Sequence, residues 1–278
     1  MWLLDRDIDH LARDVALFLV PFPLLLALHF LTPQSIQSLF VFTFDLSEPW
    51  RLLTAAYFHN SDSHLYNNLG GYAVGALLTW MLCLRMGERR WFHATFVALL
   101  LAVPVLTQLS TFAVFTYQFG PDFQTISRGF SGVVSGFGGF AFVSLLALIS
   151  TAYSRTVVWY SGFLIVLVFL NELLVIYTGT ISPTVIGLTG LGAVLSFCEM
   201  SRQSDVGFER SREAWRSIAI DAVNVVLIVS LLAIYVYMLF PSTIVSDGTA
   251  TNIYAHALGM VWGALVATVT HQLRTTKK

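Results

Sequence analysis

The stretch GFSGVVSG, residues 129–136, lies where a short polar segment gives way to a long apolar run that ends near Ile149. Two interpretations of this junction are open. Small residues four positions apart, here Gly132 and Gly136, let two helix backbones approach closely in lipid. Alternatively, Ser131 is a nucleophile at a helix N-terminus, where free N–H groups and the helix dipole favour developing negative charge. The rest of the chain decides between packing and chemistry.

The composition is that of an integral membrane protein. Of the 278 residues, 56% are hydrophobic and 11% are charged, whereas soluble domains carry about 25% charged residues. A net charge of −1 gives no indication of nucleic-acid binding. Cys83 and Cys198 end apolar runs beside basic loops, on the expected cytosolic side, where thiols stay reduced. We expect packing roles for both cysteines, with no disulfide and no metal.

Apolar runs predict an all-α fold, a polytopic transmembrane helix bundle that forms a single domain over residues 1–278. A helix needs about 20 mainly apolar residues to cross a bilayer, and eight runs approach that length. The predicted spans are residues 15–31, 64–84, 91–117, 130–149, 156–178, 181–200, 217–240 and 251–271.

The distribution of arginine and lysine sets the expected orientation. With a cytosolic N-terminus, every basic residue except Arg51 and Arg128 falls on a cytosolic segment, as the positive-inside rule requires. Without the glycine-containing span at 181–200, the basic loop at 201–216 would move outside and this bias would weaken. We therefore expect eight spans and a multi-pass protein of the cell membrane.

In this orientation Ser131 and His256 both lie near the outer ends of their helices, at similar depth. A serine hydroxyl is a weak nucleophile until a base takes its proton, and histidine, with a pKa near ~6.5, suits that task. Gly259 and Gly263 follow the histidine and predict a second small-residue seam, so the two helices would pack closely. A lone intramembrane histidine is otherwise either a hydrogen-bonded core residue or a functional one.

His64 and Asn68 are four residues apart and share one face at the outer end of the predicted second helix. Together with the backbone N–H of Ser131, their side chains would stabilise the oxyanion of a tetrahedral intermediate. His59 lies in the loop just before this helix. We interpret it as a structural hydrogen-bonding residue that supports the site.

In this order and spacing, the motifs resemble the rhomboid family of intramembrane serine proteases, over about residues 45–150 and 250–265. The resemblance implies that the Glu48–Arg51 motif braces the loop before the second helix. The residues that carry the resemblance are Glu48, Pro49, Trp50, Arg51, His59, His64, Asn68, Gly129, Phe130, Ser131, Gly132, Gly136, Ala255, His256, Ala257, Leu258, Gly259 and Gly263.

The resemblance further implies a serine endopeptidase that cleaves transmembrane segments of single-span membrane proteins near the outer face. Ser131 would be the nucleophile and His256 the general base of a dyad without an acid, with His64 and Asn68 serving the oxyanion. No cofactor and no metal are implied. The expected partners are transmembrane protein substrates and the lipid bilayer, with no nucleic acid.

The chain departs from the rhomboid pattern in two places. The family has a six-helix core with one helix between the serine and histidine helices, whereas this chain has three there, so about two helices are extra. The family also often has an aromatic residue four positions after the serine, where it stacks on the histidine. Here that position is Ser135. Phe130, Phe137 or Tyr254 would then have to restrain the imidazole.

Two rival functions stay open at this point. A rhomboid-like protein that binds membrane clients without cutting them would have the same fold, although the complete set of motif residues argues against it. A transporter or channel would use Glu172 and Asp221 as ion-handling groups, and it predicts internal repeats that the sequence does not show convincingly. The intramembrane Glu172 is either a proton or substrate contact or a neutral interior residue.

Overall fold

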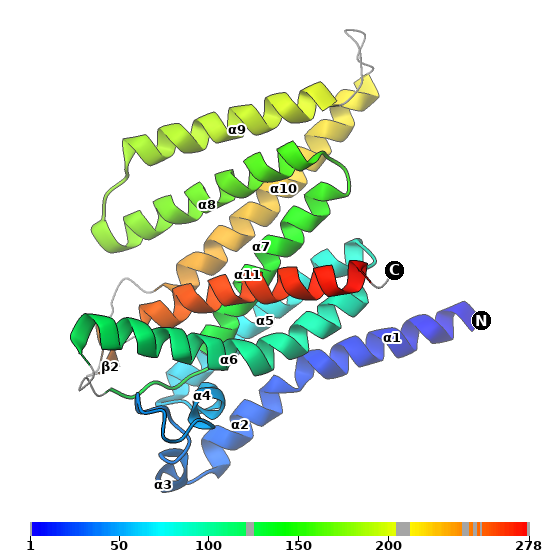
Figure 1. The fold of residues 1–278 in the computed structure, drawn as a ribbon. Helices are drawn as coiled ribbons and strands as arrows, with labels where there is room; N and C mark the ends of the chain where they lie inside the picture. The colour runs from blue at the N-terminus through cyan, green and yellow to red at the C-terminus, as the bar shows by residue number, and fades with distance from the viewer. Residues whose placement is uncertain are drawn as a thin grey trace. The chain divides into compact units, whose positions relative to one another are not determined.

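The computed structural model describes residues 2–120, 125–203, 212–240, 245–246, 249–250 and 252–276. Across these residues the chain is almost entirely helical (Figure 1). Its elements, with η1 a 3-10 turn, are α1 (Trp2–Leu19), α2 (Pro21–Leu31), α3 (Gln34–Gln37), α4 (Arg51–Thr54), η1 (Ala55–Tyr57), α5 (Asp62–Arg85), α6 (Arg89–Phe119), α7 (Ser131–Ser150), α8 (Arg155–Thr178), α9 (Pro183–Gln203), α10 (Arg212–Leu239), β1 (Val245–Ser246), β2 (Thr249–Ala250) and α11 (Ile253–Thr275).

Six segments of the described chain are long and apolar enough to cross a membrane, so the protein is a multi-pass membrane protein with a helical bundle fold. The first turns of α5 carry Asp62, His64 and Asn68, which make this helix less apolar than the six. The first predicted span covers parts of α1 and α2, and each of the other seven falls mainly on one helix. The spans predicted at residues 64–84 and 181–200 are not among the six, so the count of eight stays a prediction. The six segments are His10–Leu31, Arg89–Phe119, Ser131–Ser150, Arg155–Thr178, Ala219–Leu239 and Ile253–Thr275.

The first span is broken in the middle. α1 ends at Leu19, and α2 starts with Pro21 in its first position. Proline has no backbone N–H to offer the carbonyl of Leu17, four residues earlier, and its ring crowds that carbonyl, so a continuous helix is interrupted there. Pro23 removes a second hydrogen bond in the same way, and the two prolines together account for the break.

The chain forms two compact units, Met1–Ala141 with Thr249–Lys278, and Phe142–Gly248. Helix α7 begins in the first unit and ends in the second. Ser131 and His256 both belong to the first unit, so their relation can be described within one body. The single domain predicted from the sequence stays a prediction.

Helix α7 forms the core of the first unit through its apolar and glycine-rich N-terminal half. A Cβ added to Gly259 of α11 would overlap the carbonyl oxygen of Gly132, and one added to Gly263 would overlap the backbone of Gly136. The two helices therefore touch backbone to backbone, which only residues without side chains permit. This contact confirms the predicted pair of glycine seams.

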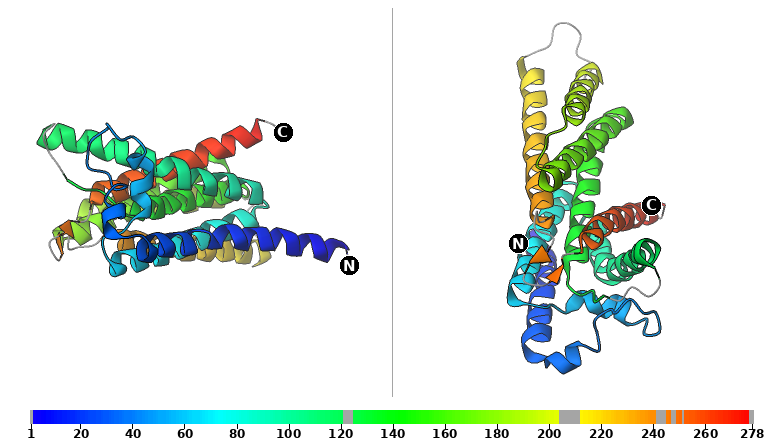
Figure 2. Two further views of the ribbon diagram at one scale, coloured as in Figure 1. Left: turned by 90° about the horizontal axis from the view of Figure 1, so that it is seen from below. Right: turned by 90° about the vertical axis from the view of Figure 1, so that its left-hand side faces the viewer.

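Helix α6 runs antiparallel to α11 and is hydrogen-bonded to it along its length. The indole Nε1 of Trp262 donates to Ser110 Oγ at 2.9 Å, and that of Trp91 donates to the Ala267 carbonyl at 3.0 Å. Both indoles are thereby satisfied inside an apolar bundle, where an unpaired N–H would be costly. Figure 2 shows α6 and α11 side by side in two further views.

Polar contacts mark one end of the first unit. The carboxylate of Asp14, 2% exposed, accepts hydrogen bonds from Trp80 Nε1 at 2.9 Å and His93 Nε2 at 2.6 Å. Arg274 pairs with Glu88 at 2.7 Å at the same end. The opposite end of the first unit contains the start of α5, the end of α6 and the start of α11. We call it the Ser131 end.

The second unit consists of the end of α7 with α8, α9 and α10. Tyr153 Oη, in the turn between α7 and α8, donates to Asp221 Oδ2 of α10 at 3.1 Å. Side-chain oxygens of Asn171 and Glu172 in α8 are buried and have no hydrogen-bond partner within the described part of this unit. Both interpretations of Glu172 stay predictions.

Candidate active site

Ser131 is the first residue of α7 and is half-buried, as the sequence predicts for a hydroxyl at a helix N-terminus. The first turn of any helix leaves N–H groups without an intrahelical acceptor. One of those adjoining Ser131, the N–H of Phe130, donates to His59 Nε2 at 3.3 Å. The remaining N–H groups of this turn lie at the positive end of the helix dipole. Together they would stabilise negative charge that develops beside Ser131.

The segment before Ser131 is tied to the loop between α2 and α5. Phe42 and Ser127 exchange two backbone hydrogen bonds, of 3.1 Å and 2.8 Å, and the N–H of Gly129 donates to the Ala55 carbonyl at 3.0 Å. The long apolar loop at residues 32–61 therefore fixes the strand-like approach to the serine.

The predicted brace in this loop is formed by a short ion pair. Arg51, at the start of α4, pairs with Glu48 three residues earlier and donates to Thr43 Oγ1 at 3.3 Å. Trp50 between them is 51% exposed. Glu48 and Arg51 thus lie together as the sequence indicates, and the braced segment leads directly into η1 and Ala55.

His64 lies against the backbone of Gly129, so that a Cβ on this glycine would overlap the imidazole ring. Gly129 also has a φ of +118°, a conformation that side chains disfavour. The ring also shares a 2.6 Å hydrogen bond between Nδ1 and Asn60 Oδ1. An amide oxygen only accepts, so Nδ1 carries the proton and Nε2 of the neutral ring is an acceptor. His64 would therefore donate to an oxyanion through Nε2 only as an imidazolium.

Asn68 lies on the face of α5 that packs against α7. One turn above it His64 meets Gly129, and three residues after it a Cβ on Gly71 would be 2.8 Å from Val134 Cγ1. Residues 64, 68 and 71 share one helical face, which places Asn68 alongside the first turn of α7. Its side chain is 5% exposed, and its Nδ2 has no hydrogen-bond partner among the residues described. Asn68 thus carries a buried neutral donor alongside the first turn of α7, and its contact with an oxyanion stays a prediction.

His59 is a hydrogen-bond acceptor in this site. Its ring is 2% exposed and packs edge-on against His64, with ring centroids 5.1 Å apart. Burial, together with the positive charges that His64, His29 and Arg128 can carry, lowers the pKa of His59 to about 3. The ring is thus neutral at physiological pH, which leaves a lone pair on Nε2 for the Phe130 N–H. This confirms the interpretation of His59 as a structural hydrogen-bonding residue.

Protonation of His59 is expected to destabilise the folded protein at acid pH. An unfolded histidine titrates near ~6.5, whereas His59 in the fold stays neutral down to about pH 3. Between these values the unfolded chain binds more protons than the folded chain. The free energy of unfolding therefore decreases as the pH is lowered, by up to about 1.4 kcal/mol per pH unit. Thermal unfolding in detergent at about pH 7 and about pH 5 measures this slope. His59→Gln, which keeps an acceptor for Phe130, should show a smaller slope, and equal slopes would contradict the prediction.

His256 is buried on the face of α11 that meets α7. It precedes Gly259 by three residues on the same helical face, and Gly259 touches the carbonyl of Gly132. His256 is therefore level with Ser131 at the start of the two helices. The rings of His256 and His64 are close enough to interact electrostatically. The hydrogen bond between Ser131 and His256 stays a prediction.

Several buried polar atoms near Ser131 are not visible as a motif in the sequence. Thr107 Oγ1, Gln108 Oε1 and Thr111 Oγ1 of α6, with Ser135 Oγ of α7, lack a hydrogen-bond partner in the described part of the chain. The side chain of Thr107 packs against Gly132. Buried polar atoms without protein partners are normally satisfied by ordered water. Sequence reasoning missed these α6 residues because they are dispersed in a continuous apolar run.

The aromatic residues that would restrain His256 are placed differently from one another. The rings of Phe130 and Phe137 pack edge-on against Tyr72, with centroids 5.9 Å and 5.4 Å away. Tyr254 packs against Phe115 at 5.6 Å. The restraint of the His256 imidazole by one of these rings stays a prediction.

Comparisons with models of protein families, with curated proteins and with solved structures gave no match. Any function for this site must therefore be argued from its own residues.

Proposed function

We propose that the chain is an intramembrane serine endopeptidase of rhomboid type, which cleaves transmembrane segments of single-span proteins near the outer face of the cell membrane. The observation that carries the proposal is the meeting of separate motifs at the Ser131 end. His64 packs on Gly129, and Gly259, one turn from His256, packs on Gly132. Residues nearly 200 positions apart in the chain thus pack against two glycines that flank Ser131, which supports the proposal.

In the proposed mechanism, His256 removes the proton from Ser131 Oγ as the oxygen attacks the scissile carbonyl carbon. The negative charge that develops on the carbonyl oxygen is held by the Ser131 N–H and Asn68 Nδ2. His256 then passes its proton to the departing amine, which leaves an acyl-enzyme on Ser131. A water molecule, activated by the same imidazole, hydrolyses that ester and restores the serine.

The membrane arrangement belongs to the same proposal. Eight spans with a cytosolic N-terminus put the Ser131 end at the outer face. A substrate helix buries its carbonyls in intrahelical hydrogen bonds, so substrates with helix-breaking Gly or Pro near their outer ends are favoured. The loop at residues 241–250 would cover the site, but residues 241–244 and 247–248 lie outside those described. So do residues 204–211 of the basic loop, where a reporter fusion should give a cytosolic signal.

Active-site labelling tests the proposal. The full-length protein in detergent is treated with a fluorophosphonate, which reacts with activated serines, and the modified residue is mapped by mass spectrometry. The expected result is a single adduct on Ser131, retained in Ser135→Ala. An adduct on another serine would overturn the nucleophile assignment. No adduct, with no cleavage of a single-span substrate in liposomes, would favour a protein that binds membrane clients without cutting them.

Gly129→Ala is expected to slow labelling of Ser131 at least about tenfold. The added methyl group occupies the place of the His64 ring, and the left-handed backbone adds about 1–2 kcal/mol of strain. Gly120→Ala is the matched control, because Gly120 has a φ of +91° but open space around its Cα. Labelling rates and thermal unfolding are compared for both variants. If the two label equally fast, the contact between Gly129 and His64 does not matter for the serine.

A further inference from the structure

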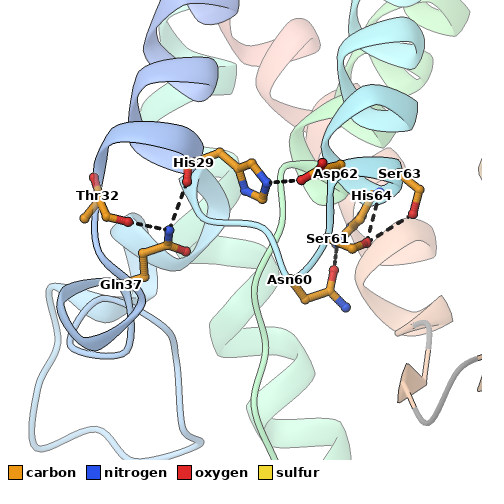
Figure 3. Close-up of polar contacts among 8 residues, drawn as sticks. All are labelled: His29, Thr32, Gln37, Asn60, Ser61, Asp62, Ser63 and His64. Atoms are coloured by element: carbon orange, nitrogen blue, oxygen red, sulfur yellow. Dashed lines mark hydrogen bonds and ion pairs between the residues drawn. The ribbon is translucent and has the colours of Figure 1, made fainter.

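A histidine outside the predicted site reaches it from the first membrane span. His29, in the last turn of α2, bonds through Nε2 to Asp62 Oδ1 at 2.8 Å, at the first residue of α5 (Figure 3). The imidazole is 10% exposed, whereas the carboxylate is 68% exposed. Gln37 fixes the end of α2 by donating to the carbonyls of His29 and Thr32, at 3.1 Å and 2.9 Å.

The hydrogen bonds of His29 and His59 define complementary tautomers. His29 donates from Nε2 to the Asp62 carboxylate, so the Nδ1 of its neutral ring is an acceptor. His59 accepts the Phe130 N–H on Nε2, so the Nδ1 of its neutral ring carries a proton. Both Nδ1 atoms are buried, and neither has a partner among the described residues. One ring thus has a proton to donate and the other a lone pair to receive it.

The two rings are close enough to be linked. Their centroids are 6.4 Å apart and the ring planes are nearly perpendicular. A direct N–H···N hydrogen bond of about 2.9 Å brings two imidazole centroids to about 5 Å or less, so the observed separation of 6.4 Å is too long for one and leaves room for a bridging water. A polar bridge of this kind also resolves the cost of two buried, unpaired ring nitrogens.

We propose that Asp62 and His29 are positioning residues that fix the tautomer of His59 and thereby the peptide preceding Ser131. The inference rests on the proposed function for its effect on the reaction. The carboxylate holds the proton of His29 on Nε2, and the lone pair on Nδ1 then accepts, through water, the proton on His59 Nδ1. With the opposite tautomer, His59 would turn an N–H toward the N–H of Phe130, and two donors would face each other. The Gly129–Phe130 peptide would then lose the orientation that sets the first turn of α7.

Two substitutions test the link through the labelling rate. Asp62→Asn removes the charge that selects the His29 tautomer and is expected to slow labelling of Ser131 about tenfold, by analogy with residues that orient a catalytic imidazole. In substrate cleavage the loss should fall on kcat and leave KM unchanged, because no substrate contact is removed. Asp62→Glu should restore most of the rate. Ser63→Ala, an exposed neighbour at the same helix start, should label like the wild type.

A double variant separates the link from a general structural effect. Asp62 acts only through His29, so Asp62→Asn should add no further loss in a His29→Phe background. If the two losses multiply instead, Asp62 does not act through His29 and the inference is overturned. It is also overturned if the wild type labels and Asp62→Asn labels equally fast, while the proposed function stands.

A measurement that does not depend on activity tests the link between Asp62, His29 and His59 if the protein has no serine-protease activity. If the wild type does not label at all, the proposed function fails, and the link is read from the ring nitrogens of His59 by NMR of full-length protein with ¹⁵N-labelled histidine in detergent. The expected result is a His59 with protonated Nδ1 and bare Nε2 in the wild type, and a mixture of tautomers in Asp62→Asn. An unchanged His59 spectrum in Asp62→Asn would overturn the inference.

Discussion

Replacing His256 by alanine is expected to slow substrate cleavage by about 10⁴-fold, because a serine hydroxyl at neutral pH is a poor nucleophile without a base. Ser131→Ala should remove both cleavage and labelling, since the attacking oxygen itself is lost. The two substitutions together should cost little more than either alone, because the pair acts as a unit. Cleavage of a single-span substrate in liposomes measures the loss, with thermal unfolding in detergent as the test that each variant is folded.

His271→Ala is the matched control on the same helix. His271 packs its ring on Trp91, with centroids 4.5 Å apart. This contact is far from the Ser131 end, near the end of the first unit that contains Asp14. His271→Ala therefore removes an imidazole from α11 without altering the Ser131 end. The cleavage rate of this variant should stay near that of the wild type. A His256→Ala variant that cleaves within tenfold of the wild type would show that another group is the base, or that the serine is not the nucleophile.

The state of His64 bears on how the oxyanion is stabilised. Its Nδ1 bonds to Asn60 Oδ1 at 2.6 Å, which leaves an acceptor at Nε2 in the neutral ring. In the proposed mechanism the neutral donors are then the Ser131 N–H and Asn68 Nδ2, and His64 contributes only when it is protonated. A simple pair of side-chain donors, as expected from the spacing of the motif alone, is thus an incomplete description of the site.

Much of the fold could be predicted because it depends on local patterns. Apolar runs predict the long helices, and the spacing of Gly132 with Gly136 and of Gly259 with Gly263 predicts a small-residue seam on each of α7 and α11. Helical periodicity likewise put His64 and Asn68 on one face. These features follow from residues within a few turns of one another, where period and spacing are reliable guides.

The features that the sequence did not reveal depend on long-range contacts. The two-way bridge between Phe42 and Ser127 joins a loop to a segment 85 residues away, and nothing in either stretch specifies the register. His29 carries no motif, and its link to Asp62 exists only because the end of α2 reaches the start of α5. Tautomers are also invisible in a sequence, because the partner of each ring nitrogen determines them.

Gly263→Ala is expected to destabilise the protein by several kcal/mol. The new Cβ would overlap the backbone of Gly136, and a backbone inside a packed bundle cannot move aside as a flexible side chain can. Helices α7 and α11 would have to separate, and His256 would move away from Ser131 although neither residue is altered. Both the midpoint of thermal unfolding in detergent and the labelling of Ser131 should fall together.

Gly187→Ala is the matched control for Gly263→Ala, because here the same substitution is expected to increase stability. Gly187 lies inside α9, where an added Cβ meets nothing within 4 Å. Alanine has a higher helix propensity than glycine by up to about 1 kcal/mol, so this variant should be slightly more stable than the wild type. The same chemical change at two helical glycines therefore shifts stability in opposite directions, because only Gly263 lies in a backbone contact. If Gly263→Ala unfolds at the wild-type temperature, α7 and α11 are not in backbone contact. The proposed dyad would then lose the packing that holds His256 level with Ser131.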